Sequence, residues 1–199
     1  MTERLTVEVI DYGAGNLGNA RRALDELGIP HRLVSAPGQI RLDGPILLPG
    51  VGNYGAAMVR LAASGLDVAL RRAAVQGRTM VGICLGLQLL LSSSEEAPGV
   101  PGLGILPGRV RRLAAGDRAV PHLGWAPVGR LGTPYYFAHS YVVAPDDPAA
   151  VVAWATYGER FPAVVRRDAI VGFQFHPERS ADPGLDLLRH ALHGERVEI

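Results

Sequence analysis

One cysteine, Cys84, stands in the sequence context of a reactive nucleophile. Gly82 and Gly86 flank it at two positions on either side, as in the Gly-x-nucleophile-x-Gly elbow, with sulfur in place of the more familiar serine oxygen. Residues 79–83 form a β-prone apolar run, and residues 85–91 suit a helix. We therefore expect Cys84 on the turn between them, where the first N–H groups of the helix favour a thiolate. The alternative is a buried cysteine that packs as a small hydrophobe.

A histidine and a glutamate late in the chain supply the base, and the group that orients the base, which a thiolate enzyme needs. His176 and Glu178 follow a strand expected over residues 170–175. Residues two apart on an extended chain point to the same face, and Pro177 biases His176 toward that conformation. Glu178 is thus expected to hold one ring nitrogen of His176 while the other faces the sulfur. An isolated histidine is more often a satisfied loop residue, but the pairing with the cysteine elbow favours the catalytic interpretation.

An oxyanion hole needs two donors. The elbow itself supplies the backbone N–H of Leu85. A second donor is expected from Val51 or Gly52, if the glycine-rich turn at residues 49–52 lies beside the thiol, where Gly50 allows a close backbone approach. Spacing alone leaves an ordinary glycine-rich turn as the alternative. Gln88 follows Cys84 by one helical turn on the same side, where we expect it to meet a substrate amide.

Composition excludes several classes of function. The chain has 199 residues, so we expect one domain over residues 1–199. Its formal net charge is +1, so we expect no surface that binds nucleic acid or a membrane. The basic residues are all arginine, which removes P-loop, Schiff-base and pyridoxal phosphate chemistry that needs a lysine of this chain. The cysteine and histidines lack the paired spacing of a metal site. Residues 1–5 lack the apolar region of a signal peptide, and with one cysteine a cytoplasmic location is expected.

The expected elements describe an α/β protein with an open, mostly parallel, doubly wound sheet, a nucleophile elbow and a smaller antiparallel β flank. Its ligands should bind at the carboxyl ends of the strands. A Gly-x-Gly-x-x-Gly spacing at residues 13–18 imitates a dinucleotide site but lacks the acidic residue about 20 positions later, which favours a surface turn. The expected strands cover residues 5–10, 31–35, 45–48, 79–83, 109–113, 135–143, 151–157, 163–167 and 170–175. The expected helices cover residues 17–27, 54–63, 66–76, 85–91 and 183–193.

With these residues assembled, the chain resembles the class I (triad) glutamine amidotransferases through its motifs at residues 49–52, 82–88 and 172–178. Within that family it is most similar to the glutaminase subunits of imidazole glycerol phosphate synthase. The narrower resemblance rests on residues 11–17, 48–52, 121–125 and 136–141. Ala126 departs from that pattern, because the family usually carries asparagine after the Gly-Trp pair.

The resemblance implies hydrolysis of L-glutamine by a Cys84–His176–Glu178 triad without a cofactor. It also implies a heterodimer with a (β/α)8 cyclase subunit, which uses the ammonia to make imidazole glycerol phosphate for histidine biosynthesis. A low activity of the isolated subunit, with a switch at Gly50 and Gly52, would avoid wasting glutamine. The implied contacts with glutamine are Gly50, Gln88, His139, Ser140 and Tyr141, and the candidates for the partner interface are Asn16, Trp125, Tyr136 and Arg179.

Three other interpretations stay open at this point. The chain would share its motifs with a glutaminase subunit of another synthase, such as those that make anthranilate or pyridoxal phosphate. The elbow also fits a stand-alone cysteine hydrolase. A non-enzymatic interaction subunit would keep Cys84 buried and unreactive.

Overall fold

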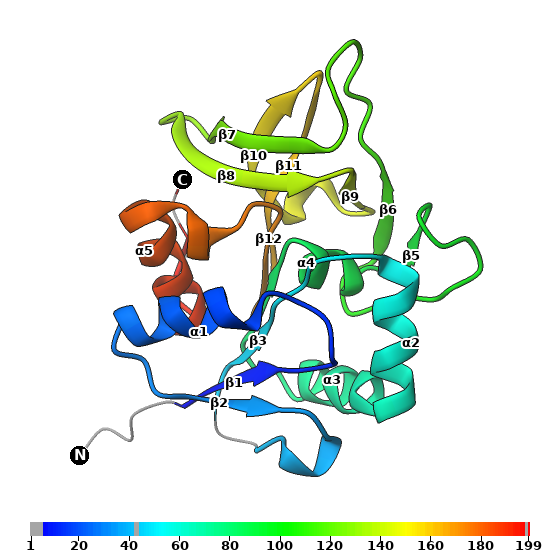
Figure 1. Cartoon of the computed structure of the whole chain (residues 1–199), viewed down its shortest axis with the longest axis vertical. Helices are drawn as coiled ribbons and strands as arrows, with labels where there is room; N and C mark the ends of the chain where they lie inside the picture. The colour runs from blue at the N-terminus through cyan, green and yellow to red at the C-terminus, as the bar shows by residue number, and fades with distance from the viewer. Residues whose placement is uncertain (1–5, 42–43, 198) are drawn as a thin grey trace.

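The computed structural model describes residues 6–41, 44–197 and 199, and its first half alternates strands and helices (Figure 1). Residues 1–5, which include the start of the first expected strand, lie outside the described residues. The first-half elements are β1 (Val7–Ile10), α1 (Leu17–Glu26), β2 (His31–Val34), β3 (Ile46–Leu48), α2 (Tyr54–Ser64), α3 (Leu66–Val75), β4 (Met80–Ile83) and α4 (Leu85–Leu89). The second half contains β5 (Ser93–Ser94), β6 (Gly108–Arg112), β7 (His122–Val128), β8 (Thr133–His139), β9 (Tyr141–Pro145), β10 (Val151–Tyr157), β11 (Glu159–Arg167), β12 (Ile170–Phe173) and α5 (Ala181–Leu192). Short 3-10 turns occur at Pro37–Gln39, Pro148–Ala150 and Pro177–Arg179.

The described strands form a nine-stranded sheet in the order β2-β1-β3-β4-β12-β11-β10-β7-β8 and a three-stranded sheet in the order β5-β6-β9. Strands β2, β1, β3, β4 and β12 run parallel, and β11, β10, β7 and β8 continue the sheet with antiparallel pairs. The expected fold class is confirmed. Much of the antiparallel flank is an extension of the main sheet, because β11 pairs directly with β12.

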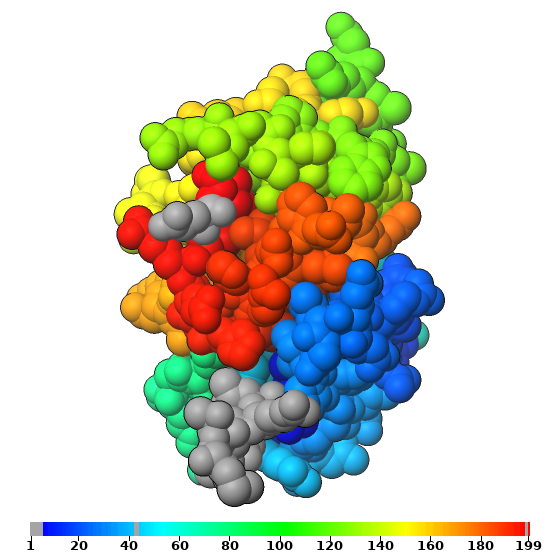
Figure 2. Space-filling view, turned by 90° about the vertical axis from the view of Figure 1, so that its left-hand side faces the viewer, coloured from blue at the N-terminus to red at the C-terminus, as the bar shows by residue number. Residues whose placement is uncertain are grey.

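Helices cover both faces of the parallel strands. Helices α1 and α5 lie on one face, where Figure 2 shows them side by side, and α2 and α3 lie on the other. Each residue of β1, β3, β4 and β12 is therefore buried, as expected for strands with helices on both sides. The local sequence sets the helix ends: the Asn53 side chain accepts a hydrogen bond from Ala56 N at 3.0 Å to begin α2, and Gly65 at φ 74° ends it.

Sequence reasoning missed or misplaced several strand boundaries. Strand β7 was not expected, because Gly124 and Pro127 interrupt its apolar pattern. The strand expected over residues 135–143 is broken at Ser140 into β8 and β9, which belong to different sheets. Strand β11 begins at Glu159 instead of residue 163, because a long antiparallel hairpin with β10 extends it. Helix α4 ends at Leu89, two residues earlier than expected.

Among the described residues, the helices are each too short or too polar to cross a lipid bilayer.

Candidate active site

Cys84 lies on a sharp turn between β4 and α4, as the elbow motif predicts. Its backbone has φ 52° and ψ −109°, an unfavourable conformation for a residue with a side chain. Its N–H donates to the Phe173 carbonyl at 2.7 Å, which ties the elbow to the end of β12. The flanking glycines are needed for space, because a Cβ on Gly82 would lie 2.8 Å from Leu87 N and one on Gly86 would overlap the Leu48 carbonyl.

His176 and Glu178 stand one strand away from the elbow. Strands β4 and β12 are parallel neighbours with Ile83 opposite Phe173, so the residues that follow them meet at one edge of the sheet. The Nδ1 of His176 donates to Glu178 Oε1 at 2.8 Å, and both side chains are about 4% exposed. The His176 backbone is fixed as well, since its N–H donates to the Tyr136 carbonyl at 2.8 Å.

The electrostatics of this group favour a charged imidazole. Burial acts to lower the pKa of His176, but the charge of Cys84, its hydrogen bond with the ring, and the Glu178 carboxylate outweigh burial and raise that pKa to about 10. At neutral pH the ring of His176 therefore carries a proton, which favours negative charge on the neighbouring sulfur. A protonated imidazole beside a cysteine is the arrangement that thiolate nucleophiles use.

A small cavity of about 210 Å³ opens onto the sulfur of Cys84. It is smaller than the ~300–1,000 Å³ typical of sites for drug-sized ligands, so it suits an amino acid. Eight of the residues singled out in the sequence line it: Val51, Gly52, Cys84, Leu85, Gln88, His139, Ser140 and Tyr141. The other lining residues are Glu96, Pro121, Leu123 and Ala138.

The turn at residues 49–52 lies against the elbow. A Cβ on Gly50 would lie 2.6 Å from Gly86 N and 2.9 Å from both Leu85 Cβ and the Tyr12 hydroxyl, so the backbone approaches here as closely as glycine permits. The hydroxyl of Tyr12 donates to the Pro49 carbonyl at 3.2 Å and fixes one end of the turn. Gly52 has φ +106° with open space around it. Val51 and Gly52 are thus held on the same cavity as Leu85.

The side-chain amide of Gln88 is engaged with the protein. Its Nε2 donates to the Tyr141 carbonyl at 2.9 Å and lies 3.4 Å from Gln174 Oε1. Gln174 Nε2 lies 4.0 Å from Cys84 Sγ. Sequence reasoning did not select Gln174 as a site residue. The available signal was its position in the motif at residues 172–178, two residues before His176 on the same face of an extended chain.

Glu96 is a second site residue that sequence reasoning missed. Its carboxylate accepts hydrogen bonds from Asn53 Nδ2 at 3.1 Å and from Tyr54 N at 2.9 Å, at the start of α2. It lines the cavity with a negative charge. It lies in a serine- and glutamate-rich loop after α4 that carried no recognisable pattern in the sequence.

Three of the four interface candidates lie together on the surface. The Arg179 guanidinium stacks over the Tyr136 ring at 3.9 Å from its centroid, and the Trp125 ring meets Tyr136 edge-on at 6.0 Å. Trp125 is 54% exposed. We call Trp125, Tyr136 and Arg179 the aromatic–arginine cluster. Asn16 instead begins helix α1, where its side chain accepts a hydrogen bond from Asn19 N at 3.2 Å.

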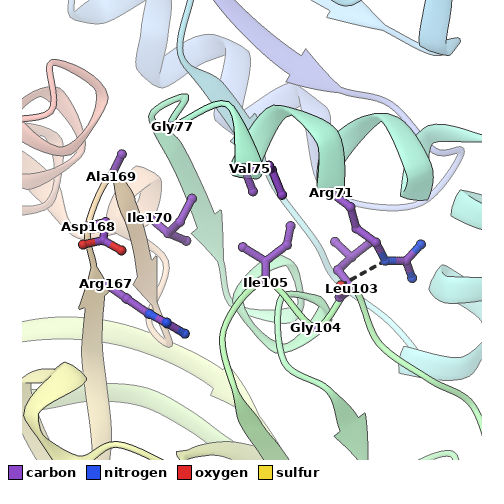
Figure 3. A pocket seen from close by; sticks show the side chains of 11 residues that line it. Arg71, Val75, Gly77, Leu103, Gly104, Ile105, Arg167, Asp168, Ala169 and Ile170 are labelled. Carbon is purple, nitrogen blue, oxygen red and sulfur yellow. Dashed lines mark hydrogen bonds between the residues drawn. The ribbon is translucent and has the colours of Figure 1, made fainter.

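A larger cavity, of about 580 Å³, lies at the opposite end of β4 and β12 (Figure 3). Arg71, Val75, Ile105 and Arg167 are among its lining residues, and Arg71 Nε donates to the Leu103 carbonyl at 3.0 Å. The lining carries no nucleophile paired with a base. Chemistry, not size, therefore places the candidate active site at the smaller cavity beside Cys84.

Comparison with known proteins agrees with this geometry. Residues 8–193 match the family model described as glutamine amidotransferase class-I, and the chain belongs to that family. Solved structures share the fold: a glutamine amidotransferase crystal structure has a TM-score of 0.78 at 24% identity, over 94% of this chain and 97% of that one. PurLQS from Thermotoga maritima has a TM-score of 0.75 at 21% identity, over 96% of this chain and 98% of that one.

Comparison with curated relatives shows which group of glutamine amidotransferases the chain is most similar to. The chain is 44% identical over 195 residues to imidazole glycerol phosphate synthase subunit HisH of Moorella thermoacetica, covering 92% of each chain. It is 45% identical over 202 residues to the subunit of the same name of Halobacterium salinarum, covering 93% of this chain and 91% of that one. Within the glutamine amidotransferases, the chain therefore belongs with the HisH subunits of imidazole glycerol phosphate synthase.

Proposed function

We propose that this chain hydrolyses L-glutamine to glutamate and ammonia with Cys84, His176 and Glu178, and passes the ammonia to a separate (β/α)8 cyclase subunit of imidazole glycerol phosphate synthase. One observation carries the assignment of residues. The parallel pairing of β4 with β12 brings the Cys84 elbow beside a buried His176, whose Nδ1 is held by Glu178 at 2.8 Å. The three groups needed for thiolate chemistry thus lie together at the carboxyl ends of two neighbouring strands.

The first half-reaction uses the charge distribution of the triad. The sulfur of Cys84 attacks the side-chain carbonyl carbon of glutamine and forms a tetrahedral adduct. His176 carries the proton of the thiol and gives it to the amide nitrogen, so the C–N bond breaks and ammonia leaves. Glu178 keeps the His176 proton on Nδ1 after that transfer and stabilises the imidazolium before it. Water then attacks the γ-glutamyl thioester, with His176 as the base, and releases glutamate and the thiol.

Charge that develops on the substrate oxygen needs donors at fixed positions. The Leu85 N–H is one, at the start of α4, and a backbone N–H of Val51 or Gly52 is the other. Each such donor contributes roughly 3 kcal/mol to the transition state in comparable enzymes. The close approach of Gly50 to Leu85 and to Gly86 N supports this arrangement, because it packs the two donor segments together at the cavity that Cys84 also lines. The freedom of Gly52 makes the second donor the one that a partner can adjust.

The cavity has suitable groups for the amino-acid end of glutamine. The carboxylate of Glu96 offers a counter-charge to the α-ammonium group, and Ser140 and Tyr141 line the same cavity. Gln88 holds the Tyr141 carbonyl and so fixes that wall. A glutamine molecule bound in this way would extend through the cavity from Glu96 to Cys84.

The aromatic–arginine cluster supports docking of the cyclase subunit. An exposed tryptophan beside a stacked arginine is typical of protein interface hot spots. Tyr136 is coupled to the active site, because its carbonyl accepts the His176 N–H and its N–H donates to Ser180 Oγ at 2.9 Å. A partner bound there would cover the exit of ammonia, which free solvent would otherwise protonate.

The proposal is tested by measuring glutamate release from glutamine by the isolated subunit and by its mixture with the cyclase subunit and the nucleotide substrate of that subunit. We expect weak release by the subunit alone and strong stimulation in the complex. Activity that does not change on addition of the cyclase would remove the assignment of the partner. Efficient turnover of esters or peptides without a partner would instead support a stand-alone hydrolase.

A further inference from the structure

Two buried histidines lie beneath the candidate active site and take no part in the triad. His122 of β7 is 2% exposed and His139 of β8 is 5% exposed. His122 is stacked between Tyr157, at 4.0 Å between ring centroids, and Phe137, at 4.9 Å. The two histidines face each other across the strand pair, with His122 Nδ1 at 3.2 Å from His139 Nε2.

The partners of these rings fix where their protons lie. His139 Nδ1 is 3.0 Å from the Tyr141 carbonyl, which can only accept, so Nδ1 carries the proton. His139 Nε2 is then an acceptor, and His122 Nδ1 must donate to it. The hydrogen bonds therefore run in one direction, from His122 through His139 to the backbone of Tyr141.

The Tyr141 carbonyl depends on side chains for its position. Tyr141 begins β9 and lies opposite Arg112 of β6. The neighbouring pair carries the ladder hydrogen bond, from Leu113 N–H to the Ser140 carbonyl at 3.0 Å, so the Tyr141 carbonyl points away from β6. The carbonyl accepts from His139 Nδ1 and from Gln88 Nε2 at 2.9 Å. The position of the Tyr141 carbonyl is thus set by Gln88 of helix α4 and by the histidine pair.

We propose that His122 is a positioning residue of the glutamine site, which acts through His139 to hold the Ser140–Tyr141 backbone against the cavity beside Cys84. The proposal rests on the proposed glutaminase function. His122 itself does not line the cavity, whereas its neighbours Pro121 and Leu123 and its partner His139 do. Its effect should therefore fall on glutamine binding more than on the chemistry at the sulfur.

The test compares three substitutions of His122 in the complex with the cyclase subunit. Asparagine places its amide nitrogen the same number of bonds from Cα as ring Nδ1, so H122N retains the donor, while H122Q moves it one bond further away. H122F keeps the aromatic stack and removes the donor. We expect KM for glutamine to rise about five- to tenfold in H122F and H122Q, the factor that matches one neutral hydrogen bond. We expect H122N to stay within about threefold of the wild type, with kcat changed less than about twofold throughout.

The matched control is Y157F, which removes a hydrogen bond from the same aromatic group, since the Tyr157 hydroxyl donates to the Ala119 carbonyl at 2.9 Å. We expect an unchanged KM for this variant. An unchanged KM in both H122F and H122Q, or equal KM values for H122N and H122Q, overturns the proposal. If H122F does not fold, the comparison of H122N with H122Q decides alone.

Nitrogen NMR of the histidine rings at neutral pH provides a readout that does not depend on activity. We expect His139 as its Nδ1–H tautomer in the wild type and in H122N. A proton on Nε2 of His139 in the wild type contradicts the proposed direction of the hydrogen bonds. A wild-type complex that releases no glutamate, with the expected tautomer present, means instead that the proposed function has failed.

Discussion

Gly50 gives the sharpest test of the second oxyanion donor. An alanine there would place its Cβ 2.6 Å from Gly86 N and 2.9 Å from Leu85 Cβ, closer than side-chain carbons approach other atoms. The turn at residues 49–52 would have to move by roughly 0.5–1 Å to restore ordinary contact distances. A displacement of about 1 Å in a catalytic group costs about 10²-fold in rate, which agrees with the 10²–10³-fold effect of losing one oxyanion donor.

We therefore expect G50A to lower the kcat of glutamine hydrolysis about 100-fold in the complex, with KM changed less than about threefold. The assay is steady-state glutamate release at saturating cyclase subunit. Alkylation of Cys84 by iodoacetamide should proceed at the wild-type rate, since the thiol and His176 are not displaced. Gly38→Ala is the matched control, because a Cβ there meets nothing within 4 Å and the backbone is not in the left-handed region. A G50A complex with kcat within about twofold of the wild type would refute the role of this turn.

Three further outcomes follow from the structure. E178Q should reduce kcat and lower the pKa of His176 from about 10, because it removes a carboxylate that raises that pKa. An unchanged pKa of His176 in an NMR titration would contradict the role of Glu178. W125A should weaken binding of the cyclase subunit at least about tenfold by calorimetry. V75A, which truncates an 89% exposed valine at the end of helix α3, should not. Equal affinities of the two variants would remove the cluster from the interface. Burial lowers the pKa of His122 to about 4 and that of His139 to about 3. Below pH 6.5 these histidines therefore bind protons in the unfolded chain but not in the folded one. The free energy of unfolding should fall as the pH drops from 6.5 toward 4. Chemical denaturation should show a shallower fall in H122F, and an identical pH dependence would argue against a neutral buried pair.

The parallel half of the fold and the grouping of Cys84, His176 and Glu178 could be predicted because each of their sequence signals is local. The spacing of Gly82, Cys84 and Gly86 predicts a nucleophile elbow, and the His-Pro-Glu run directly follows an apolar strand. Parallel strands place their carboxyl ends at one edge of the sheet, so the sequence indicates that Cys84 and His176 share that edge. The pairing of β4 with β12 makes them neighbours there.

The rest depended on contacts between residues far apart in the sequence. Strand β7 contains Gly124 and Pro127 and exists because it pairs with β8 and β10, not because of its own propensity. The histidine pair requires the register of β7 on β8, which places His122 opposite His139. Gln174 and Glu96 reach the active site through tertiary packing that no spacing rule describes.

The interface candidates could be selected from the sequence, but their grouping could not. The proximity of Trp125, Tyr136 and Arg179 follows from the β7–β8 register and from the turn after His176. Arg179 stacks on Tyr136, whereas the carboxylate of its neighbour Glu178 is buried against His176.

The most direct test of the central claim is mass spectrometry of the Cys84 peptide after rapid acid quenching of the complex during turnover of glutamine. We predict a γ-glutamyl group attached to Cys84 in the wild type, and neither adduct nor glutamate release in C84A. Release of glutamate by the C84A complex at the wild-type rate would contradict the assignment of Cys84 as the nucleophile.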